Sequence, residues 1–193
     1  MAARTARTSG ILTAALLLAG AVAAPSAGAT EDREAAAADL PHCVMDTRTG
    51  TESCFASFPQ AIAAATGGQV TDAPSSPRTA AQGDRGRAFR TEMKALQADE
   101  VVQGTFFEDG QYGGSSLTIY GAEPCKKDGW VNYQYDLPDD WKNRVSSVQP
   151  WADCWLWLYP EPGLGGDRDG PFKENSPDVG SFMNDRAQSI GFS

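Results

Sequence analysis

The chain has 193 residues, of which 41% are hydrophobic, and a formal net charge of −9 at pH 7. This acidity excludes surfaces built for nucleic acid or anionic lipid, because both repel a negative protein. It leaves divalent cations and basic protein surfaces as candidate partners, although most such carboxylates serve solubility.

Residues 1–29 are predicted to be a secretory signal peptide. Arg4 and Arg7 give a basic start without acids, "ILTAALLLAGAVAA" is an apolar stretch too short to remain in a bilayer, and "AGAT" offers a cleavage site after Ala29. An uncleaved anchor is the alternative. No later apolar run is long enough to span a membrane. We expect an exported, soluble protein, with a net charge of −11 after cleavage (14 Lys and Arg against 25 Asp and Glu).

Export decides how the four cysteines are interpreted. Four cysteines allow three pairings, and an even number in an oxidising compartment favours disulfides. Proximity favours a local Cys43–Cys54 loop and a Cys125–Cys154 bridge in the later part of the chain. A zinc site is a poor alternative, because no two cysteines have C-x-x-C spacing and His42 is the only histidine.

Residues 30–68 are predicted to form a small N-terminal unit. Residues 30–41 are rich in Ala and acids and are expected to be disordered. The stretch "CVMDTRTGTESC" then predicts a disulfide hairpin. In "SFPQAIAAATGG" a short helix is predicted, with Ser57 as N-cap, Pro59 in the first turn and Gly67 at the end. The unit has too few large apolar residues for a core of its own.

Residues 69–100 are predicted to be a linker. The stretch 69–88 is rich in Pro, Ser, Gly and Asp. Phe89, Met93 and Leu96 then follow at spacings of four and three, which indicates a weak amphipathic helix. This helix either docks on the later domain or stays solvated. A further alternative is that the whole segment before residue 101 is a pro-region removed after export.

Residues 101–193 are predicted to form the main domain. They hold all five tryptophans and all five tyrosines of the chain. Alternating stretches such as "GTFFE", "SLTIY", "VNYQY" and "CWLWLY" are separated by Gly, Pro and Asp turns, which is typical of an antiparallel all-β sandwich. About ninety residues with large aromatics and an internal disulfide can bury an adequate core.

One spacing occurs twice in this domain. A large apolar residue is followed by another five positions later and by a glycine two further on: Phe107, Tyr112 and Gly114 in the first copy, and Tyr159, Leu164 and Gly166 in the second. A later block repeats as well, since "WKNRVSSVQ" aligns with "MNDRAQSIG" and places Ser147 opposite Ser189. Two related units of about four strands should pack as a pseudo-symmetric pair, because one unit cannot bury its own apolar face.

These paired motifs resemble the Greek keys of the βγ-crystallin domain over residues 102–193. In that family an aromatic pair packs on a folded hairpin, the glycine takes a conformation closed to other residues, and the later serine holds the hairpin by hydrogen bonds. Leu164 stands in place of the usual second aromatic. The expected fold class is all-β: a two-motif Greek-key βγ-crystallin-like sandwich, preceded by the disulfide hairpin, the short helix and the linker.

The resemblance also implies a calcium site. In calcium-binding members each motif ends in two Asn or Asp positions, two free positions, a Ser or Thr and a Ser, and each ion is shared across the motifs. The first motif here begins with Lys142 in place of an oxygen donor, and the second has Gln188 in place of the hydroxyl. One site should therefore survive and the other be weak or absent, with about one calcium per domain. The candidate ligands are Asn143, Ser146, Asn184 and Asp185.

No enzymatic activity is expected. A Ser-His-Asp arrangement would have to use His42, which stands beside a predicted disulfide cysteine outside the main domain. A cysteine nucleophile needs a free thiolate, and all four cysteines are better explained as paired. The adjacent acids Glu108–Asp109 and Asp139–Asp140 offer a glycosidase-like pair, but such acids on turns are far more often solvated or metal-facing.

The βγ-crystallin resemblance implies two further roles, because small secreted metalloprotease inhibitors and killer-toxin-like proteins have the same fold. For an inhibitor, the insert between Gly121 and Asp136, tied down by Cys125, is the candidate loop; a plain surface loop is the alternative. The toxin role has no residue of its own. The expected protein is a secreted monomer whose partner could be a secreted protease, and neither nucleic acid nor a membrane is expected to bind.

Overall fold

The computed structural model describes residues 40–96, 101–121 and 124–193; the predicted signal peptide, 1–29, lies outside them. No helix in the described part is long and apolar enough to cross a membrane. The strands are β1 (His42–Asp46), β2 (Thr51–Phe55), β3 (Val101–Asp109), β4 (Gly113–Gly121), β5 (Tyr133–Asp136), β6 (Ser147–Pro150), β7 (Leu156–Tyr159), β8 (Asp169–Phe172) and β9 (Ser189–Phe192). The helices are α2 (Phe58–Ala65), α3 (Pro77–Ala81) and α4 (Gly83–Lys94), with short 3-10 turns η1 (Gly110–Tyr112) and η2 (Pro162–Leu164).

The strands form two sheets that exchange strands between the sequence repeats. Sheet A has the order β2-β1-β4-β3-β6, and sheet B has the order β5-β9-β7-β8. Strand β5 belongs to the first repeat but pairs with β9 of the second. In return, Val148 of the first repeat forms a bridge with Ser176 of the second. The predicted all-β, two-motif sandwich is therefore confirmed.

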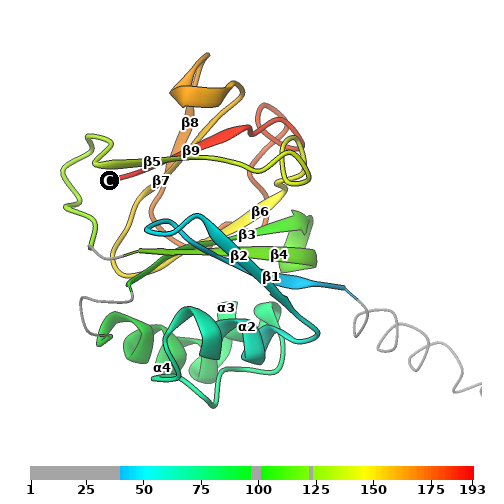
Figure 1. Cartoon of the computed structure of the whole chain (residues 1–193), viewed down its shortest axis with the longest axis vertical. Helices are drawn as coiled ribbons and strands as arrows, with labels where there is room; N and C mark the ends of the chain where they lie inside the picture. Colours follow the sequence, from blue (N-terminus) through cyan, green and yellow to red (C-terminus); the bar gives the residue numbers. More distant parts are fainter. Residues whose placement is uncertain (1–39, 97–100, 122–123) are drawn as a thin grey trace, which may run out of the picture.

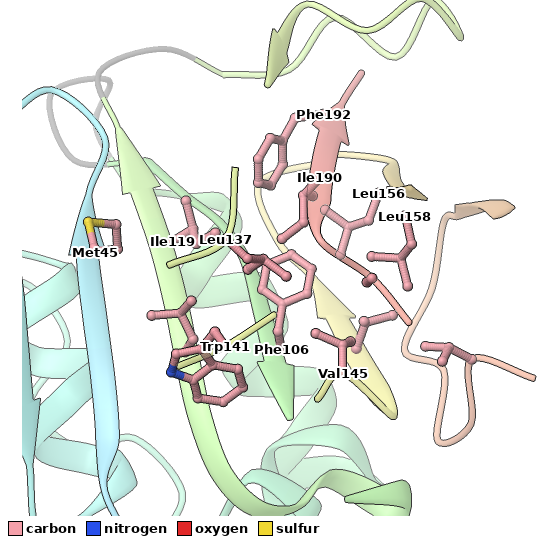
Figure 2. Close-up of a cluster of buried hydrophobic side chains, with 14 of the residues drawn as sticks. Met45, Phe106, Ile119, Leu137, Trp141, Val145, Leu156, Leu158, Ile190 and Phe192 are labelled. Carbon is pink, nitrogen blue, oxygen red and sulfur yellow. The ribbon is translucent and has the colours of Figure 1, made fainter. Parts of the chain in front are cut away.

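The first hydrophobic core fills the space between the sheets (Figure 2). Alternation in β7 turns Leu156 and Leu158 inward, toward Phe106 of β3, and Ile190 of β9 lies beside them. These four side chains are fully buried. Burial of each is worth roughly 1.5–3 kcal/mol relative to exposure, so this core is the main source of stability for the sandwich.

The first predicted hairpin is present and is held by Ser147. The Ser147 hydroxyl donates to the Asp109 carbonyl at 2.7 Å and accepts from the Tyr112 backbone N–H at 3.0 Å. The rings of Phe107 and Tyr112 meet edge to face at 5.7 Å between centroids. Both bonds are made by one wholly buried side chain, so the serine holds the turn in place.

The second hairpin repeats this arrangement. The Ser189 hydroxyl donates to the Glu161 carbonyl at 2.6 Å and accepts from the Leu164 N–H at 3.0 Å. Leu164 has φ 62° and Tyr112 has φ 60°, so the leucine occupies the same left-handed position as the aromatic it replaces. The spacing seen in the sequence thus builds the same turn twice.

Residues 42–94 are part of the same body as the sandwich. Strand β1 pairs antiparallel with β2 and parallel with β4, which adds two strands to sheet A. Helices α2, α3 and α4 lie on the face of sheet A that points away from sheet B (Figure 1). The molecule consequently has three layers: sheet B, sheet A and helices.

A second hydrophobic core joins the helices to sheet A. Phe58 of α2 and Met93 of α4 are buried in it, and Phe89 meets Trp151 edge to face at 5.4 Å. The amphipathic helix predicted around Phe89 and Met93 therefore docks on the sheet. Val102 of β3 lies in the same cluster.

Within the predicted linker, 69–100, residues 77–81 and 83–94 form α3 and α4, so the helical part begins well before the weak helix predicted from Phe89 to Leu96. The glycine content of this segment favours a linker. A Cβ at Gly86 would lie 2.9 Å from the Ala80 carbonyl oxygen, so this glycine allows α3 and α4 to approach closely. Ser57 stands at the N-cap of α2 as predicted, but its side chain makes no capping hydrogen bond.

Both predicted disulfides are present. Cys43 and Cys54 face each other across β1 and β2, and their sulfurs are bonded at 2.00 Å. The Cys125–Cys154 bridge ties the insert after β4 to the turn that precedes β7. No free cysteine is found in the described part of the chain.

Candidate calcium site

Two loops, each with one left-handed Asn or Asp, precede β6 and β9 and carry the predicted ligands. Asn143 in the first loop has φ 60° and Asp185 in the second has φ 56°, a left-handed conformation that Asn and Asp tolerate best. The Asn143 N–H donates to the Ala187 carbonyl at 2.9 Å, and the Asp185 N–H donates to the Val145 carbonyl at 3.1 Å. Each loop is thus fixed by a backbone bond to the other, across the two motifs.

An arginine closes each loop on itself. Arg144 donates to the Asp140 carbonyl at 2.6 Å, and Arg186 donates to the Phe182 carbonyl at 2.9 Å, in both cases four residues earlier. These guanidinium groups satisfy backbone oxygens and so restrict the shape of each loop.

The structure brings three of the four predicted ligands together. The Ser146 hydroxyl donates to Asp185 Oδ1 at 3.1 Å, across the motifs. The Asn184 amide donates to the other oxygen of the same carboxylate at 2.8 Å. Ser146 is 6% exposed and Asp185 is exposed, so the group is fixed on one side and open to solvent on the other. A hydroxyl, a carboxylate and an amide oxygen are ligands that suit a hard cation such as Ca²⁺.

The fourth predicted ligand, Asn143, lies in the other half of the predicted calcium site, which is related to the first by the pseudo-symmetry. This half offers poorer oxygen ligands for a cation. The Lys142 ammonium lies 2.6 Å from Asp139 Oδ1 and lowers the pKa of that carboxyl. Gln188 takes the place of Ser146 here, and its backbone N–H donates to the Tyr159 carbonyl at 2.8 Å. This half has no hydroxyl at the position where the other half has Ser146.

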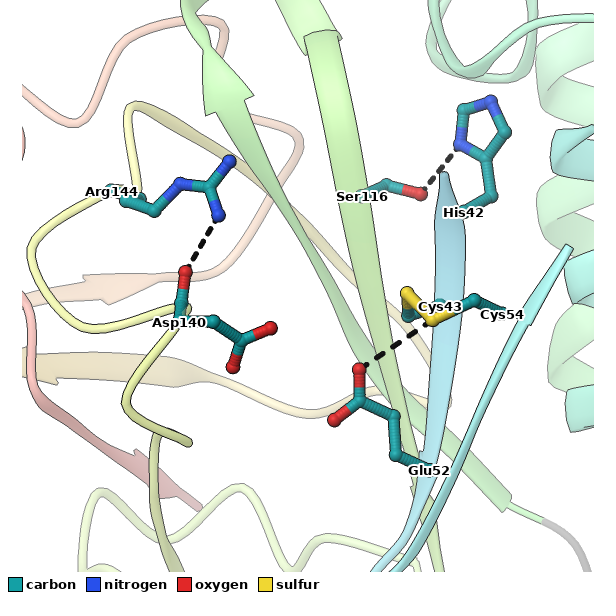
Figure 3. Close-up of a disulfide and its surroundings, with 7 residues drawn as sticks. All are labelled: His42, Cys43, Glu52, Cys54, Ser116, Asp140 and Arg144. Carbon is teal, nitrogen blue, oxygen red and sulfur yellow. Dashed lines mark hydrogen bonds between the residues drawn. A yellow bond between two sulfur atoms is a disulfide. The ribbon is translucent and has the colours of Figure 1, made fainter. Parts of the chain in front are cut away.

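A second cluster of potential ligands lies at the N-terminal hairpin (Figure 3). Atoms of Cys43, Glu52 and Cys54 lie within 4.8 Å of one another. Both sulfurs are already joined in a disulfide, however, and a disulfide offers no thiolate to a metal. Glu52 remains as the single ionic donor, which is too little for a metal site while the disulfide is intact.

The structure pairs His42 with Ser116, which sequence reasoning missed. His42 Nδ1 lies 2.8 Å from Ser116 Oγ, and the two residues are 74 positions apart. Figure 3 draws this hydrogen bond as a dashed line. Burial lowers the pKa of His42 below its ordinary value, so the ring is neutral at pH 7. Ser116 has 0% exposure and cannot meet a substrate in this conformation. The pair therefore satisfies two buried polar groups between β1 and β4.

Two of the acids considered for glycoside hydrolysis, Glu108 and Asp139, form ion pairs. Glu108 lies 2.6 Å from Arg144, which lowers the pKa of its carboxyl. Asp140 affects two neighbours through its charge. The pKa of Glu52 is raised by burial and then by the charge of Asp140. The pKa of Tyr135 is raised to about 12, by burial first and then by the charges of Glu52 and Asp140. These are interactions between sheet A, sheet B and a loop.

Residues 124–136 of the predicted inhibitor loop are held by hydrogen bonds to side chains. Asp128 accepts a hydrogen bond from the Trp130 N–H at 2.9 Å, and Asn132 accepts one from the Lys126 N–H at 3.0 Å. Trp130 has 78% of its surface exposed and belongs to the same insert as the disulfide-bonded Cys125. Nothing in the sequence alone distinguished this tryptophan from the buried ones.

Comparison with known proteins yields structural likenesses. No protein-family model and no curated protein matches the sequence. A βγ-crystallin domain from Clostridium beijerinckii is similar over 47% of this chain and 95% of that one, with 21% identity and a TM-score of 0.37. A βγ-crystallin domain from Flavobacterium johnsoniae (47% and 92% covered, 19% identity, TM-score 0.35) and the N-terminal domain of protein S (47% and 94%, 20%, 0.36) are similar to the same degree. The strand exchange and the two serine-held hairpins give residues 101–193 the two-motif Greek-key fold of a βγ-crystallin domain, a fold that by itself assigns no function.

Proposed function

We propose that this protein is an exported, non-enzymatic βγ-crystallin-like module that binds one calcium ion between its two motifs. The observation that supports the proposal is the contact between the Ser146 hydroxyl and the Asp185 carboxylate, which come from different motifs. Export is supported by the two disulfides, because such bonds persist in oxidising compartments.

The affinity follows from the number of charged ligands. Asp185 is the single carboxylate of this group and is exposed, whereas tight calcium sites combine several carboxylates. Binding is therefore expected in the micromolar to millimolar range that extracellular modules use. The ion would bind the folded chain and not the unfolded one, so calcium should raise the melting temperature.

The test is calorimetric titration of calcium into the metal-free full-length chain, with thermal melts in parallel. One binding event is expected, lost in Ser146→Ala and in Asp185→Asn; asparagine keeps the left-handed backbone while removing the charge. Gln188→Ala is the matched control in the other half and should bind as the wild type does. Absence of both heat and a melting shift at millimolar calcium would rule the proposal out.

A second candidate function, inhibition of a secreted protease, is favoured by the exposure of Trp130 on a loop fixed by a disulfide. A rigid aromatic side chain in a protruding loop is the kind of anchor that dominates binding energy at protein interfaces. Assays with thermolysin-like and serine proteases test it. Inhibition should be lost in Trp130→Ala and kept in Ser53→Ala, a change at an exposed position of β2. Full activity of every protease in the presence of the wild type would dismiss this role.

A further inference from the structure

A cleft with a positive lining lies where α4 meets the turn between β6 and β7 and the segment after β8. Its volume is about 180 Å³. Four cations and two carboxylates line it, which gives a formal charge of +2 in a chain whose total is −9. The charged residues are Arg90, Lys94, Lys127, Lys173, Asp153 and Glu174.

Two of the cations share one carboxylate. Lys94 Nζ and Lys127 Nζ lie 2.6 and 2.8 Å from the same oxygen, Oδ1 of Asp153. The hydrogen bonds from Lys127 and Lys94 lower the pKa of Asp153, so this carboxyl is ionised. One negative charge held between two ammonium groups leaves one positive charge uncompensated.

The turn that presents Asp153 has an unusual backbone. Asp153 has φ 63° and Ala152 before it has φ 44°, and alanine is unfavourable in the left-handed region. The Cys154 N–H closes the turn on the Trp151 carbonyl at 2.7 Å, and the disulfide to Cys125 fixes its end. Strained backbone of this kind persists only where the surroundings over-determine it, and it often marks a site.

The other two cations have neutral partners. Arg90 donates to the Pro150 carbonyl at 3.1 Å and to the Asn175 side-chain oxygen, and its guanidinium lies 5.1 Å from the centre of the Trp151 ring. Lys173 Nζ lies 3.8 Å from the centre of the Trp155 ring. Among the described residues neither cation forms an ion pair with a carboxylate. The carboxylates of Glu174 and Asp153 attract the Arg90 guanidinium from a distance, but within the described part of the chain no direct ion pair neutralises Arg90 or Lys173.

We propose that this cleft binds a compact oxyanion, a phosphate, sulfate or carboxylate group, between Arg90, Lys173 and the Lys94–Lys127 pair. Ammonium and guanidinium groups that converge on one small space form strong, charge-assisted hydrogen bonds to such oxygens. Helix α4 supplies two of the four cations, so the site depends on the helical layer docked on the sandwich. It shares no residue with the Ser146–Asp185 group and does not depend on the calcium proposal.

The test titrates sodium phosphate, sodium sulfate and sodium acetate, each separately, into the full-length chain, freed of calcium on a chelating resin, at constant ionic strength. Saturable binding of one anion and a rise in melting temperature are expected. Lys173→Gln should weaken the affinity about tenfold, the loss of one charge-assisted contact. Arg87→Gln is the control: it removes an exposed cation of the same helix that is paired with Asp84 outside the cleft, and it should bind as the wild type does.

The named outcomes separate the ligand chemistry. Binding of phosphate and sulfate without acetate identifies a tetrahedral oxyanion, and binding of acetate identifies a carboxylate. Melting curves without anion establish that each variant folds, and Lys127→Gln replaces Lys173→Gln if the latter does not. No saturable binding of any of the three anions, or an affinity in the folded lysine variant equal to that of the wild type, overturns the proposal.

Discussion

The side-chain amide of Gln149 in β6 donates a hydrogen bond of 2.9 Å to the backbone carbonyl of Pro77 at the start of α3. The two residues are 72 positions apart, and both are buried. The bond joins sheet A directly to the helical layer. The helices are thus bound to the sandwich by specific polar contacts as well as by apolar packing.

A chain that begins at Val101 should therefore fail to fold stably, whereas one that begins at Leu40 should melt cooperatively. Without the helices and β1, the buried side chains of Val102 and Trp151 become exposed and β4 loses a hydrogen-bonded neighbour. Circular dichroism melts and binding of a hydrophobic dye compare the two chains. Equal melting temperatures would show instead that the helical layer is dispensable, as a removable pro-region requires.

Ser147→Ala and Ser189→Ala should each lower the free energy of unfolding by about 1–3 kcal/mol, because each leaves a hairpin N–H without its partner. The two losses should be similar, since the serines make the same pair of bonds. Urea denaturation measures both. Ser53→Ala, at an exposed position of β2, is the control and should stay within about 0.5 kcal/mol of the wild type. A loss in the hairpin variants no larger than in this control contradicts the role given to the serines.

Stability should fall in mild acid because of His42. Burial lowers its folded-state pKa below the ordinary value of 6.5, so the unfolded chain takes up a proton at higher pH than the folded chain. The contribution of neutral His42 is complete above pH 6.5 and is lost as the pH falls through the folded-state pKa. Urea denaturation between about pH 5 and 7, where histidine titrates, should give a steeper dependence for the wild type than for His42→Gln. Identical slopes would show that another group governs this range.

The weaker half of the calcium site should be repairable. Gln188→Thr restores the missing hydroxyl, and Lys142→Asp replaces an ammonium with a carboxylate where the motif needs an oxygen. The double variant is expected to bind two calcium ions where the wild type binds one, measured by calorimetric stoichiometry. A single binding event in the double variant, with wild-type affinity, would mean that the backbones of the two halves do not place calcium ligands in the same way.

Much of the sandwich could be predicted because its signals are local. The hairpin depends on a few nearby residues, and a left-handed glycine and two large apolar side chains at fixed spacing leave a clear pattern. Ser147 and Ser189 were found because the pattern occurs twice and the copies align. The disulfides followed from the cysteine spacing. Ser146 and Asp185 came together as the crosswise sharing of the motifs implies.

The helical layer and the cleft had no such signal. Strand β1 pairs with β4, far along the chain, and nothing in its five residues indicates that partner. Glycine is a residue type common in linkers, but at Gly86 it is required by the close contact between α3 and α4. The cations Arg90, Lys127 and Lys173 come from three separate segments, so only the assembled structure brings them together.

The insertion of β1 between β2 and β4 has a consequence for the order of folding. The hairpin of β1 and β2 can close early, since its disulfide spans 11 residues, but it must wait for β4, because His42 pairs with Ser116 74 positions away. Pairing between segments that are this far apart in the sequence slows folding. During synthesis the hairpin is made first and docks late, and until then the open edge of β1 is available to any other chain with an unpaired strand. Refolding should therefore compete with association between chains through the edge of β1, and this association should become faster as the protein concentration rises.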